Sequence, residues 1–85
     1  MPLSRLRSQI DRIDRQLLRL LNRRAAAAAR IGRFKKSRGL PVYDGRREGA
    51  VLKRLLRANR GPLPAASVRG IFREILQHSR KLQIR

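Results

Sequence analysis

A regular alternation of apolar residues at intervals of three and four runs through residues 3–34. It passes through Leu3, Leu6, Ile10, Ile13, Leu17, Leu20, Ala27, Ile31 and Phe34, with Arg24 as its interruption. This spacing aligns side chains on one face of an α-helix, whereas a half-buried strand alternates at every second residue. We therefore expect one long amphipathic helix in the first half of the chain.

Turn and capping signals divide the chain into three helices. Ser4 can cap the first helix, and the segment RGLP at 38–41 supplies the glycine and proline that commonly follow a helix end. Asp44 is a good N-cap for a second helix, which the segment NRGP at 59–62 ends, and Pro64 suits the first turn of a third. We predict a single all-α domain over residues 1–85, with helices at about 4–38, 45–58 and 64–83.

The first predicted helix is too long for the rest of the chain to cover. At 1.5 Å per residue it would measure about 50 Å, whereas a compact domain of this size has a radius of gyration of about 12 Å. Its apolar stripe needs another surface, and a second copy of the chain is the simplest one. We expect an intertwined homodimer. Gly32 and the alanines at 25–29 allow close helix approach, although alanine is also simply the best helix former.

The composition limits the function classes. The chain contains no cysteine and one histidine, so thiolate zinc sites and histidine metal sites are excluded, and we expect no cofactor. It has no apolar run long enough to span a membrane and no signal-peptide core, which favours a soluble cytoplasmic protein. The 23 Lys and Arg against five Asp and Glu give a net charge of +18, which attracts polyanions and small anionic substrates alike.

Polar residues interrupt the apolar stripe of every predicted helix. Arg24 occupies an apolar position of the first helix, and Lys35 lies about 20° from it at 100° per residue. Glu48 shares a face with the apolar residues of the second helix, close to Asp44. Each of these has a simpler interpretation, because a polar residue can set the register of a helix pair and a helix end is usually solvated.

Ser79 and Gln83 similarly continue the apolar line of the third helix at its C-terminal end, where a fraying polar terminus is the simpler interpretation. Taken together, the interruptions predict one polar pocket between the three helices. A pocket with cations, two acids and neutral donors suits a small ligand that carries carboxylates and a hydroxyl, because buried charges must be paired.

Three segments resemble the all-helical, AroQ-class chorismate mutases: LRSQIDRIDRQLLRLLNRR (6–24), IGRFKKSRGLPVYDGRRE (31–48) and IFREILQHSRKLQ (71–83). The resemblance covers nearly the whole chain. It implies an entwined dimer of three-helix chains that rearranges chorismate to prephenate on the pathway to phenylalanine and tyrosine. Such a unimolecular rearrangement needs no nucleophile, no metal and no cofactor.

The resemblance also implies roles for individual residues. Arg24 and Arg47 match the residues that hold the substrate carboxylates, with Arg7 reaching in from the partner chain. Lys35 and Gln83 match the donors to the ether oxygen of the breaking bond. The remaining matches are Glu48 and Asp44 near the ring hydroxyl, and Ser79 as a helper at a carboxylate. Of these, Lys35, Gln83, Arg24 and Glu48 are the expected catalytic residues.

Arg7 offers a check on the dimer that does not depend on the resemblance. It lies 17 residues before Arg24, or about 26 Å along one helix, so one small ligand cannot touch both within a chain. An antiparallel pair of long helices would bring one Arg7 to the other chain's Arg24, and two-fold symmetry then gives two equivalent sites.

The charge distribution departs from the family, whose members usually mix acids with their surface lysines. Repulsion among the arginines should weaken fold and dimer at low salt, and nonspecific nucleic-acid binding is expected. A basic nucleic-acid-binding helical module is therefore one alternative function, although it leaves the acids Asp44 and Glu48 unexplained. A second alternative is an isochorismate pyruvate-lyase, which resembles the chain around Arg33-Phe34-Lys35. A third is a catalytically inactive dimer.

Overall fold

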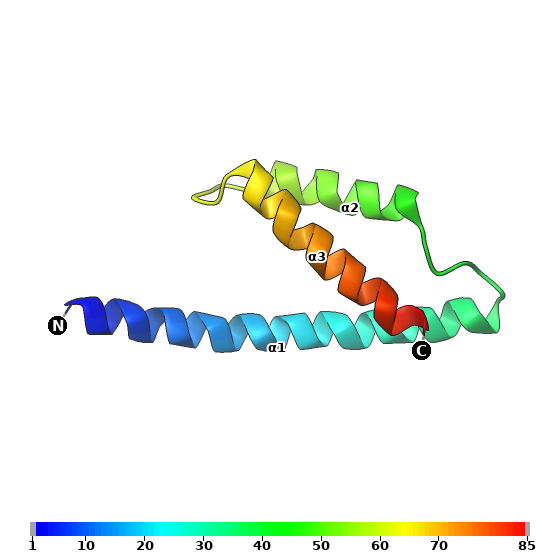
Figure 1. Ribbon diagram of the computed structural model, residues 1–85, viewed down its shortest axis with the longest axis horizontal. Helices are drawn as coiled ribbons and strands as arrows, with labels where there is room; N and C mark the ends of the chain where they lie inside the picture. The colour runs from blue at the N-terminus through cyan, green and yellow to red at the C-terminus, as the bar shows by residue number, and fades with distance from the viewer. Residues whose placement is uncertain (1, 85) are drawn as a thin grey trace.

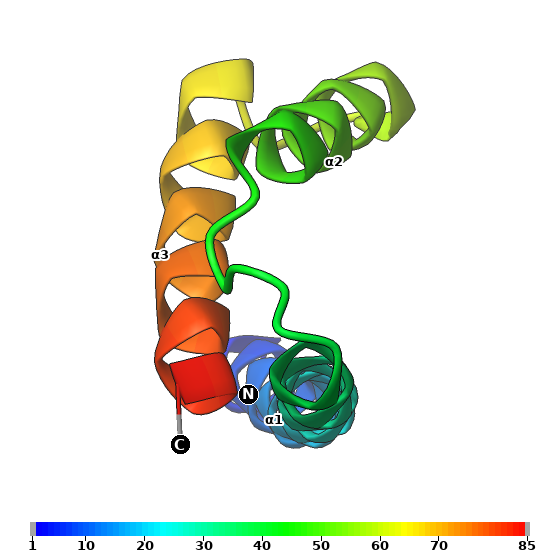
Figure 2. The ribbon, with the colours of Figure 1, turned by 90° about the vertical axis from the view of Figure 1, so that its right-hand side faces the viewer.

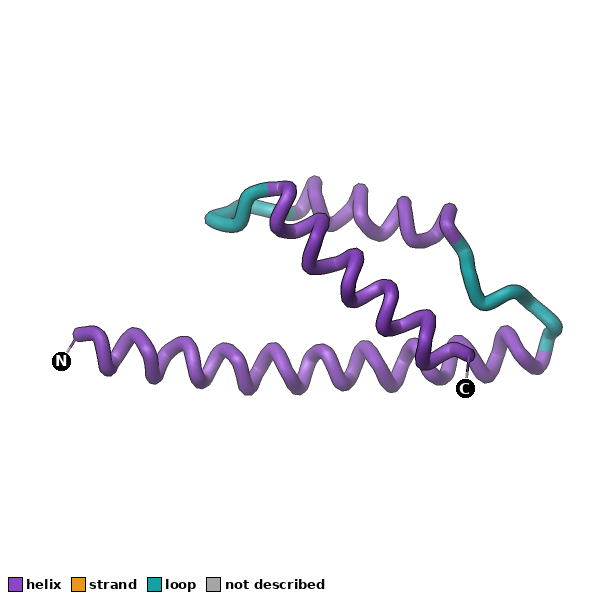
Figure 3. The backbone as a smooth tube through the Cα atoms, in the orientation of Figure 1, coloured by secondary structure: helices purple, strands orange, loops and turns teal. Residues whose placement is uncertain are grey.

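The computed structural model describes residues 2–84, which form three helices: α1 (Pro2–Ser37), α2 (Gly45–Ala58) and α3 (Ala65–Ile84). Figure 3 shows helices joined by two loops and no strand within this part of the chain. The predicted all-α class, with a long, a short and a medium helix, is confirmed. The bounds of α2 are those expected from the sequence, and α3 is displaced by one residue.

The two ends of α1 follow different rules. The helix already includes Pro2, so Ser4 lies inside its first turn and the prediction that Ser4 caps the helix is wrong. Proline suits a first helical turn because its missing N–H would have no partner there. At the other end Gly39 adopts a φ of 66°, and the Leu40 N–H donates to the Lys35 carbonyl at 2.8 Å. Glycine is favoured at this left-handed position because it has no Cβ.

Asp44 caps α2 as predicted, since its Oδ1 accepts a hydrogen bond from the Arg47 N–H at 3.0 Å. The helix ends at Ala58, and Gly61 turns the chain with a φ of 74°. The Pro64 carbonyl then accepts hydrogen bonds from the N–H groups of Ser67 and Val68, which starts α3. These local signals fix both ends of α2 and the start of α3.

Helix α3 is the element that holds the other two together. It packs against both α1 and α2, whereas no Cα atom of α2 lies within 8 Å of a Cα atom of α1 in residues 2–84. Figure 1 shows α3 running diagonally from α2 to the C-terminal half of α1, and Figure 2 shows α1 and α2 separated along its length. The buried apolar side chains, Ala28, Val68 and Leu76, lie on α1 and α3. The position of α2 relative to α1 therefore depends on α3 and the loop at 38–44.

The N-terminal half of α1 extends away from this packed region (Figure 1). Its apolar stripe is uncovered: Leu6 is 58% exposed and Leu17 50% exposed. The chain measures 56 × 24 × 15 Å with a radius of gyration of 15.9 Å, well above the roughly 12 Å of a compact domain of this length. Among the described helices, none combines the length and apolar character that crossing a bilayer requires.

Candidate active site

A cavity of about 350 Å³ lies between the C-terminal half of α1, the start of α2 and the end of α3. Seven of the eight residues predicted from the sequence line it: Arg24, Lys35, Asp44, Arg47, Glu48, Ser79 and Gln83. Arg80 also faces it, and apolar side chains that include Ala28, Ile31, Val51 and Leu76 complete the wall. The interruptions of the three apolar stripes thus meet in one place.

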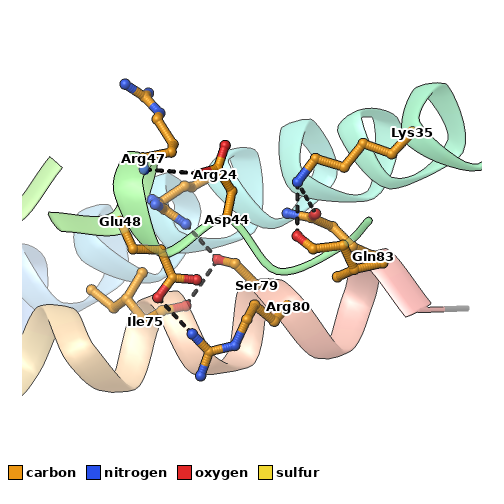
Figure 4. Close-up of polar contacts among 10 residues, drawn as sticks. Arg24, Lys35, Asp44, Arg47, Glu48, Ile75, Ser79, Arg80 and Gln83 are labelled. Atoms are coloured by element: carbon orange, nitrogen blue, oxygen red, sulfur yellow. Dashed lines mark hydrogen bonds and ion pairs between the residues drawn. The ribbon is translucent and has the colours of Figure 1, made fainter. Parts of the chain in front are cut away.

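Arg24 is held in the cavity by Ser79. Its Nη1 donates to the Ser79 hydroxyl, which in turn donates to the Ile75 carbonyl at 2.8 Å (Figure 4). Ser79 is only 8% exposed, so this hydroxyl is a fixed acceptor from α3 for a cation on α1. Because the Ser79 proton is used within its own helix, the side chain orients Arg24.

Lys35 and Gln83 form a second contact between α1 and α3. The Lys35 Nζ donates to the Gln83 Oε1 at 3.0 Å and to the Val42 carbonyl at 2.8 Å. An ammonium has three hydrogens, so one is left for a ligand. The Gln83 amide oxygen accepts from Lys35, which leaves its NH₂ as the donor available to the cavity. The pair therefore offers N–H groups at one end of the site.

A close helix contact places Gln83 there. Gly32 is buried, and a Cβ built on it would lie 2.6 Å from the Gln83 Cα. Any larger residue would push α3 away from α1 at the level of the Lys35–Gln83 pair. The expectation that Gly32 permits close helix approach is confirmed.

The acids at the start of α2 have different surroundings. Asp44 is exposed and caps the helix through the Arg47 N–H. The Arg47 side chain is exposed at the rim, and Figure 4 shows its guanidinium pointing away from Ser79 and Arg80. Glu48 is half-buried between α2 and α3. Glu48 is thus the half-buried acid of the cavity, whereas Asp44 lines its exposed edge.

Arg80 is the site residue that sequence reasoning missed. Its Nη1 lies 2.5 Å from the Glu48 Oε1, and its guanidinium lies 5.3 Å from the centre of the Tyr43 ring. The signal was the half-buried acid itself, because a carboxylate in that position needs a cation. The choice among 23 Lys and Arg could not be made from helix periodicity, which emphasised the face of α3 that carries Ser79 and Gln83.

Arg7 is the predicted site residue that the structure does not bring to the cavity. It is exposed on the N-terminal half of α1, 17 residues before Arg24 and about 26 Å away along the helix. Within one chain it is therefore too far away to touch a ligand in the cavity.

The charges of the cavity favour an anion. Among the hydrogen bonds of residues 2–84, those of the Arg24 and Lys35 side chains go to neutral oxygens, and Arg80 matches the charge of Glu48. The lining also holds Arg47 and Asp44, whose charges offset each other. The positive charge of Arg24 and Lys35 is therefore available to a ligand. Fold and site together define a three-helix protein with a polar cavity whose lining carries more cations than acids.

Comparison with known proteins gives the family. Residues 6–84 match the model of the family described as chorismate mutase type II, and the chain belongs to this family. It is 42% identical over 78 residues to a bifunctional chorismate mutase/prephenate dehydratase of Aquifex aeolicus. This match covers 87% of this chain and 22% of that protein. It is 49% identical over 70 residues to the protein of the same description from Neisseria gonorrhoeae, with coverages of 82% and 19%. The chain thus spans about a fifth of these curated relatives.

Two solved structures are similar over almost their entire length. Form II of the chorismate mutase from Thermus thermophilus is 39% identical, with a TM-score of 0.98, and the match covers 100% of this chain and 97% of that one. Form I of the same protein gives a TM-score of 0.91, with 93% and 99% covered. The three-helix arrangement is therefore that of a known chorismate mutase structure.

Proposed function

We propose that the chain is a chorismate mutase, an isomerase that converts chorismate to prephenate for the synthesis of phenylalanine and tyrosine. In this rearrangement the ether C–O bond breaks while a C–C bond forms in the same molecule, and no proton is transferred. The observation that carries the proposal is the meeting of Arg24, Lys35, Glu48 and Gln83 in one cavity. Family membership supports it independently.

The carboxylates of the substrate are assigned to the arginines. Arg24 is fixed by Ser79 and can form a charge-assisted hydrogen bond from the floor of the cavity. Arg47 stands at the exposed rim, from which a guanidinium can fold over a bound ligand. Holding both carboxylates selects the compact conformer in which the two reacting carbons are close, and this removes part of the entropic barrier.

The ether oxygen is assigned to the Lys35–Gln83 end of the site. Negative charge develops on this oxygen as the C–O bond breaks, and donors that are already oriented stabilise it without reorganisation. Lys35 and Gln83 orient each other through their hydrogen bond, and the Val42 carbonyl holds Lys35 as a second acceptor. By analogy with oxyanion-hole deletions, losing one such donor should cost about 3–4 kcal/mol of transition-state stabilisation.

Glu48 is assigned to the ring hydroxyl of chorismate. Its Oε1 is engaged by Arg80, and among the hydrogen bonds of residues 2–84 none uses its Oε2. An ionised carboxylate oxygen is an acceptor only, which suits a hydroxyl that donates. Asp44 then acts by capping α2 and so fixing the turn that carries Arg47 and Glu48.

We also propose that two chains form an intertwined homodimer with shared sites. The uncovered stripe of α1 supports it, since Leu6, Ile10, Ile13 and Leu17 are between 46% and 58% exposed. Apolar surface of this length is costly in water, and a second α1 packed antiparallel would cover it. The same pairing would deliver Arg7 to the partner chain's cavity. A cytoplasmic location stays a prediction.

The test is the loss of chorismate absorbance on adding purified protein at moderate salt, with prephenate identified as the product. Lys35→Ala should lower kcat by about 100-fold or more, since it removes an oriented donor. Lys36→Ala is the matched control, because it removes the same charge from an exposed neighbour and should leave kcat unchanged. A folded protein with no turnover, or with equal turnover in both variants, contradicts the proposal. Assaying isochorismate in parallel tests the pyruvate-lyase alternative.

A second candidate function is nonspecific polyanion binding, which one observation favours. Seven exposed arginines fall within an arc of about 80° along α1 at 100° per residue: Arg5, Arg12, Arg15, Arg19, Arg23, Arg30 and Arg33. The two acids of α1, Asp11 and Asp14, lie outside this arc. The arginine stripe is about 42 Å long at 1.5 Å per residue, and it suits the phosphates of a nucleic acid.

A further inference from the structure

Arg80 lies at a boundary between two hollows of the surface. One is the candidate active site, and the other is an outer groove between α2 and α3 that is lined by Tyr43, Gly45, Gly49, Leu52, Arg73 and Gln77. Glu48, Leu76 and Arg80 line both. The ion pair between Glu48 and Arg80 is therefore part of the wall that separates the cavity from the groove.

The geometry of the pair leaves part of Glu48 free. Arg80 Nη1 engages Glu48 Oε1 at 2.5 Å, and the two side chains are 34% and 21% exposed. The guanidinium is also covered on one face by the Tyr43 ring, 5.3 Å from its centre. Figure 4 shows the Arg80 side chain running along α3 to the end of the Glu48 side chain. Arg80 thus restrains the carboxylate through one oxygen and leaves the other for a ligand.

The architecture makes this restraint important. The Cα atoms of α2 and α1 do not approach within 8 Å of each other in residues 2–84, so α2 is positioned mainly by α3 and by the loop that precedes it. Arg80 contacts both, since Glu48 belongs to α2 and Tyr43 to the loop. One side chain on α3 therefore contacts both an acid on α2 and Tyr43 in the loop that leads into α2.

Without Arg80, Glu48 would be a free carboxylate in a cavity that also holds Arg24 and Arg47. A half-buried acid gains free energy by pairing with a cation, and unpaired charge in such a place is costly. Glu48 would then compete with the substrate carboxylates for these arginines. The Glu48–Arg80 pair prevents that competition because the carboxylate is already paired with a cation before the substrate binds.

We propose that Arg80 is a positioning residue for the rearrangement: it holds Glu48 at the hydroxyl end of the cavity and keeps Arg24 and Arg47 available to the substrate carboxylates. This inference rests on the proposed chorismate mutase function. Arg80 acts through Glu48, and its main effect is on substrate binding.

The test compares KM and kcat for five variants in the chorismate assay, with thermal unfolding measured for each. Arg80→Gln should raise KM about tenfold, with a smaller effect on kcat, because coupled neighbours typically interact by an amount of this order. Lys81→Gln is the matched control, since it removes an exposed cation from the same turn of α3 and should leave KM unchanged. Arg80→Lys keeps the cation beside Glu48 but loses the planar guanidinium over Tyr43, so its KM should lie between those of the unmodified protein and Arg80→Gln.

The double variant Glu48→Gln/Arg80→Gln distinguishes positioning from a general structural role. Once Glu48 is neutral it cannot capture Arg24 or Arg47, so the double variant should have the KM of Glu48→Gln alone, within about threefold. A KM unchanged in Arg80→Gln, or a double variant whose losses multiply, overturns the inference. Arg80→Met, which keeps an apolar stem of similar length, replaces Arg80→Gln if the latter does not fold.

The two proposals can fail separately. If the unmodified protein turns chorismate over while Arg80→Gln keeps its KM, only the Arg80 inference fails. If the unmodified protein shows no turnover, chorismate itself serves as a binding probe in calorimetry, and the same order of affinities among the variants is expected. Absence of chorismate binding by the unmodified protein overturns both.

Discussion

Gly32 of α1 faces the backbone of Gln83 on α3 so closely that a Cβ on Gly32 would lie 2.6 Å from the Gln83 Cα and 2.9 Å from its carbonyl oxygen. The obstacle is backbone, which cannot rotate away as a flexible side chain can. The close contact between Gly32 and Gln83 therefore also sets the position of the Gln83 side-chain amide, a proposed catalytic group. Stability and activity are coupled at this contact.

Gly32→Ala should lower both thermal stability and kcat. Alanine is favoured over glycine in a helix by about 1 kcal/mol, but overpacking of this kind costs about 1–3 kcal/mol and displaces α3. We expect a lower melting temperature and a kcat at least tenfold lower, measured by calorimetry and by the chorismate assay.

Gly70→Ala is the control for that substitution. Gly70 is an exposed glycine of α3, and a Cβ there would meet no atom within 4 Å. The variant should keep its kcat and gain about 0.5–1 kcal/mol of stability. If Gly32→Ala were equally stabilised and active, the close contact between α1 and α3 would have no role in the site.

Ser79→Ala should weaken substrate binding more than it weakens the fold. The change leaves the Arg24 guanidinium without its acceptor from α3, so the cation loses its fixed orientation. We expect KM to rise about tenfold while the free energy of unfolding falls by about 1–2 kcal/mol, the usual range for a buried hydrogen bond. Initial rates over a range of chorismate concentrations measure the first quantity and urea unfolding the second.

Ser8→Ala is the control for Ser79→Ala, since Ser8 is exposed on the N-terminal half of α1. Equal effects of the two serine substitutions would show that the Ser79 hydroxyl does not act on Arg24.

Leu17→Gln should disrupt the proposed homodimer. Leu17 is half-exposed on the apolar stripe of α1, where the second copy is expected to pack. Burying a leucine contributes about 1.5–3 kcal/mol per side chain, and the two-fold symmetry makes the loss occur twice. Sedimentation should show a dissociation constant raised at least 100-fold, and chorismate turnover should fall in parallel because each cavity would no longer receive Arg7 from a second chain.

Arg19→Gln is the matched control for the dimer, because Arg19 belongs to the arginine stripe and its removal reduces repulsion. It should associate at least as well as the unmodified chain. A Leu17→Gln protein that remains dimeric and active would place the interface elsewhere.

The arginine stripe should control salt-dependent binding to nucleic acid without affecting catalysis. Replacing Arg12, Arg19 and Arg30 with Gln should reduce the slope of log affinity against log salt by about 0.9 for each phosphate that is no longer neutralised. Binding to a duplex at several salt concentrations measures the slope, and the chorismate assay should show an unchanged kcat. An unaltered slope would mean that the arginine stripe is not the nucleic-acid surface.

Local chemistry explains which parts of this structure could be predicted from the sequence. The repeat from Leu3 to Phe34 gives a helix because hydrophobic spacing follows the helical turn, and Asp44 and Gly39 mark helix ends through their own hydrogen bonding and φ. Polar residues in apolar stripes could likewise be predicted to share a pocket, because a polar group that is buried must be paired or face a ligand.

The start of α1 shows the limit of such signals. Ser4 would be a good N-cap and Pro2 suits a first helical turn, so both residues are compatible with a helix start. A local pattern alone therefore does not decide at which of them the helix begins. The pairing of Glu48 with Arg80 could not be predicted from a local sequence pattern for a different reason. Sequence periodicity gives the face of one helix, whereas the partner of an acid depends on the distance and rotation between two helices.

The sequence by itself determined the helical class, the Asp44 cap, the helix end at Gly39 and the set of polar residues that interrupt the stripes, because these follow from interactions within a few residues. Tertiary structure alone decided that Gly32 meets Gln83, that Ser79 orients Arg24 and that Arg80 pairs with Glu48. Each of these depends on how α3 crosses α1 and α2, and that crossing is set by side-chain packing summed over the whole interface.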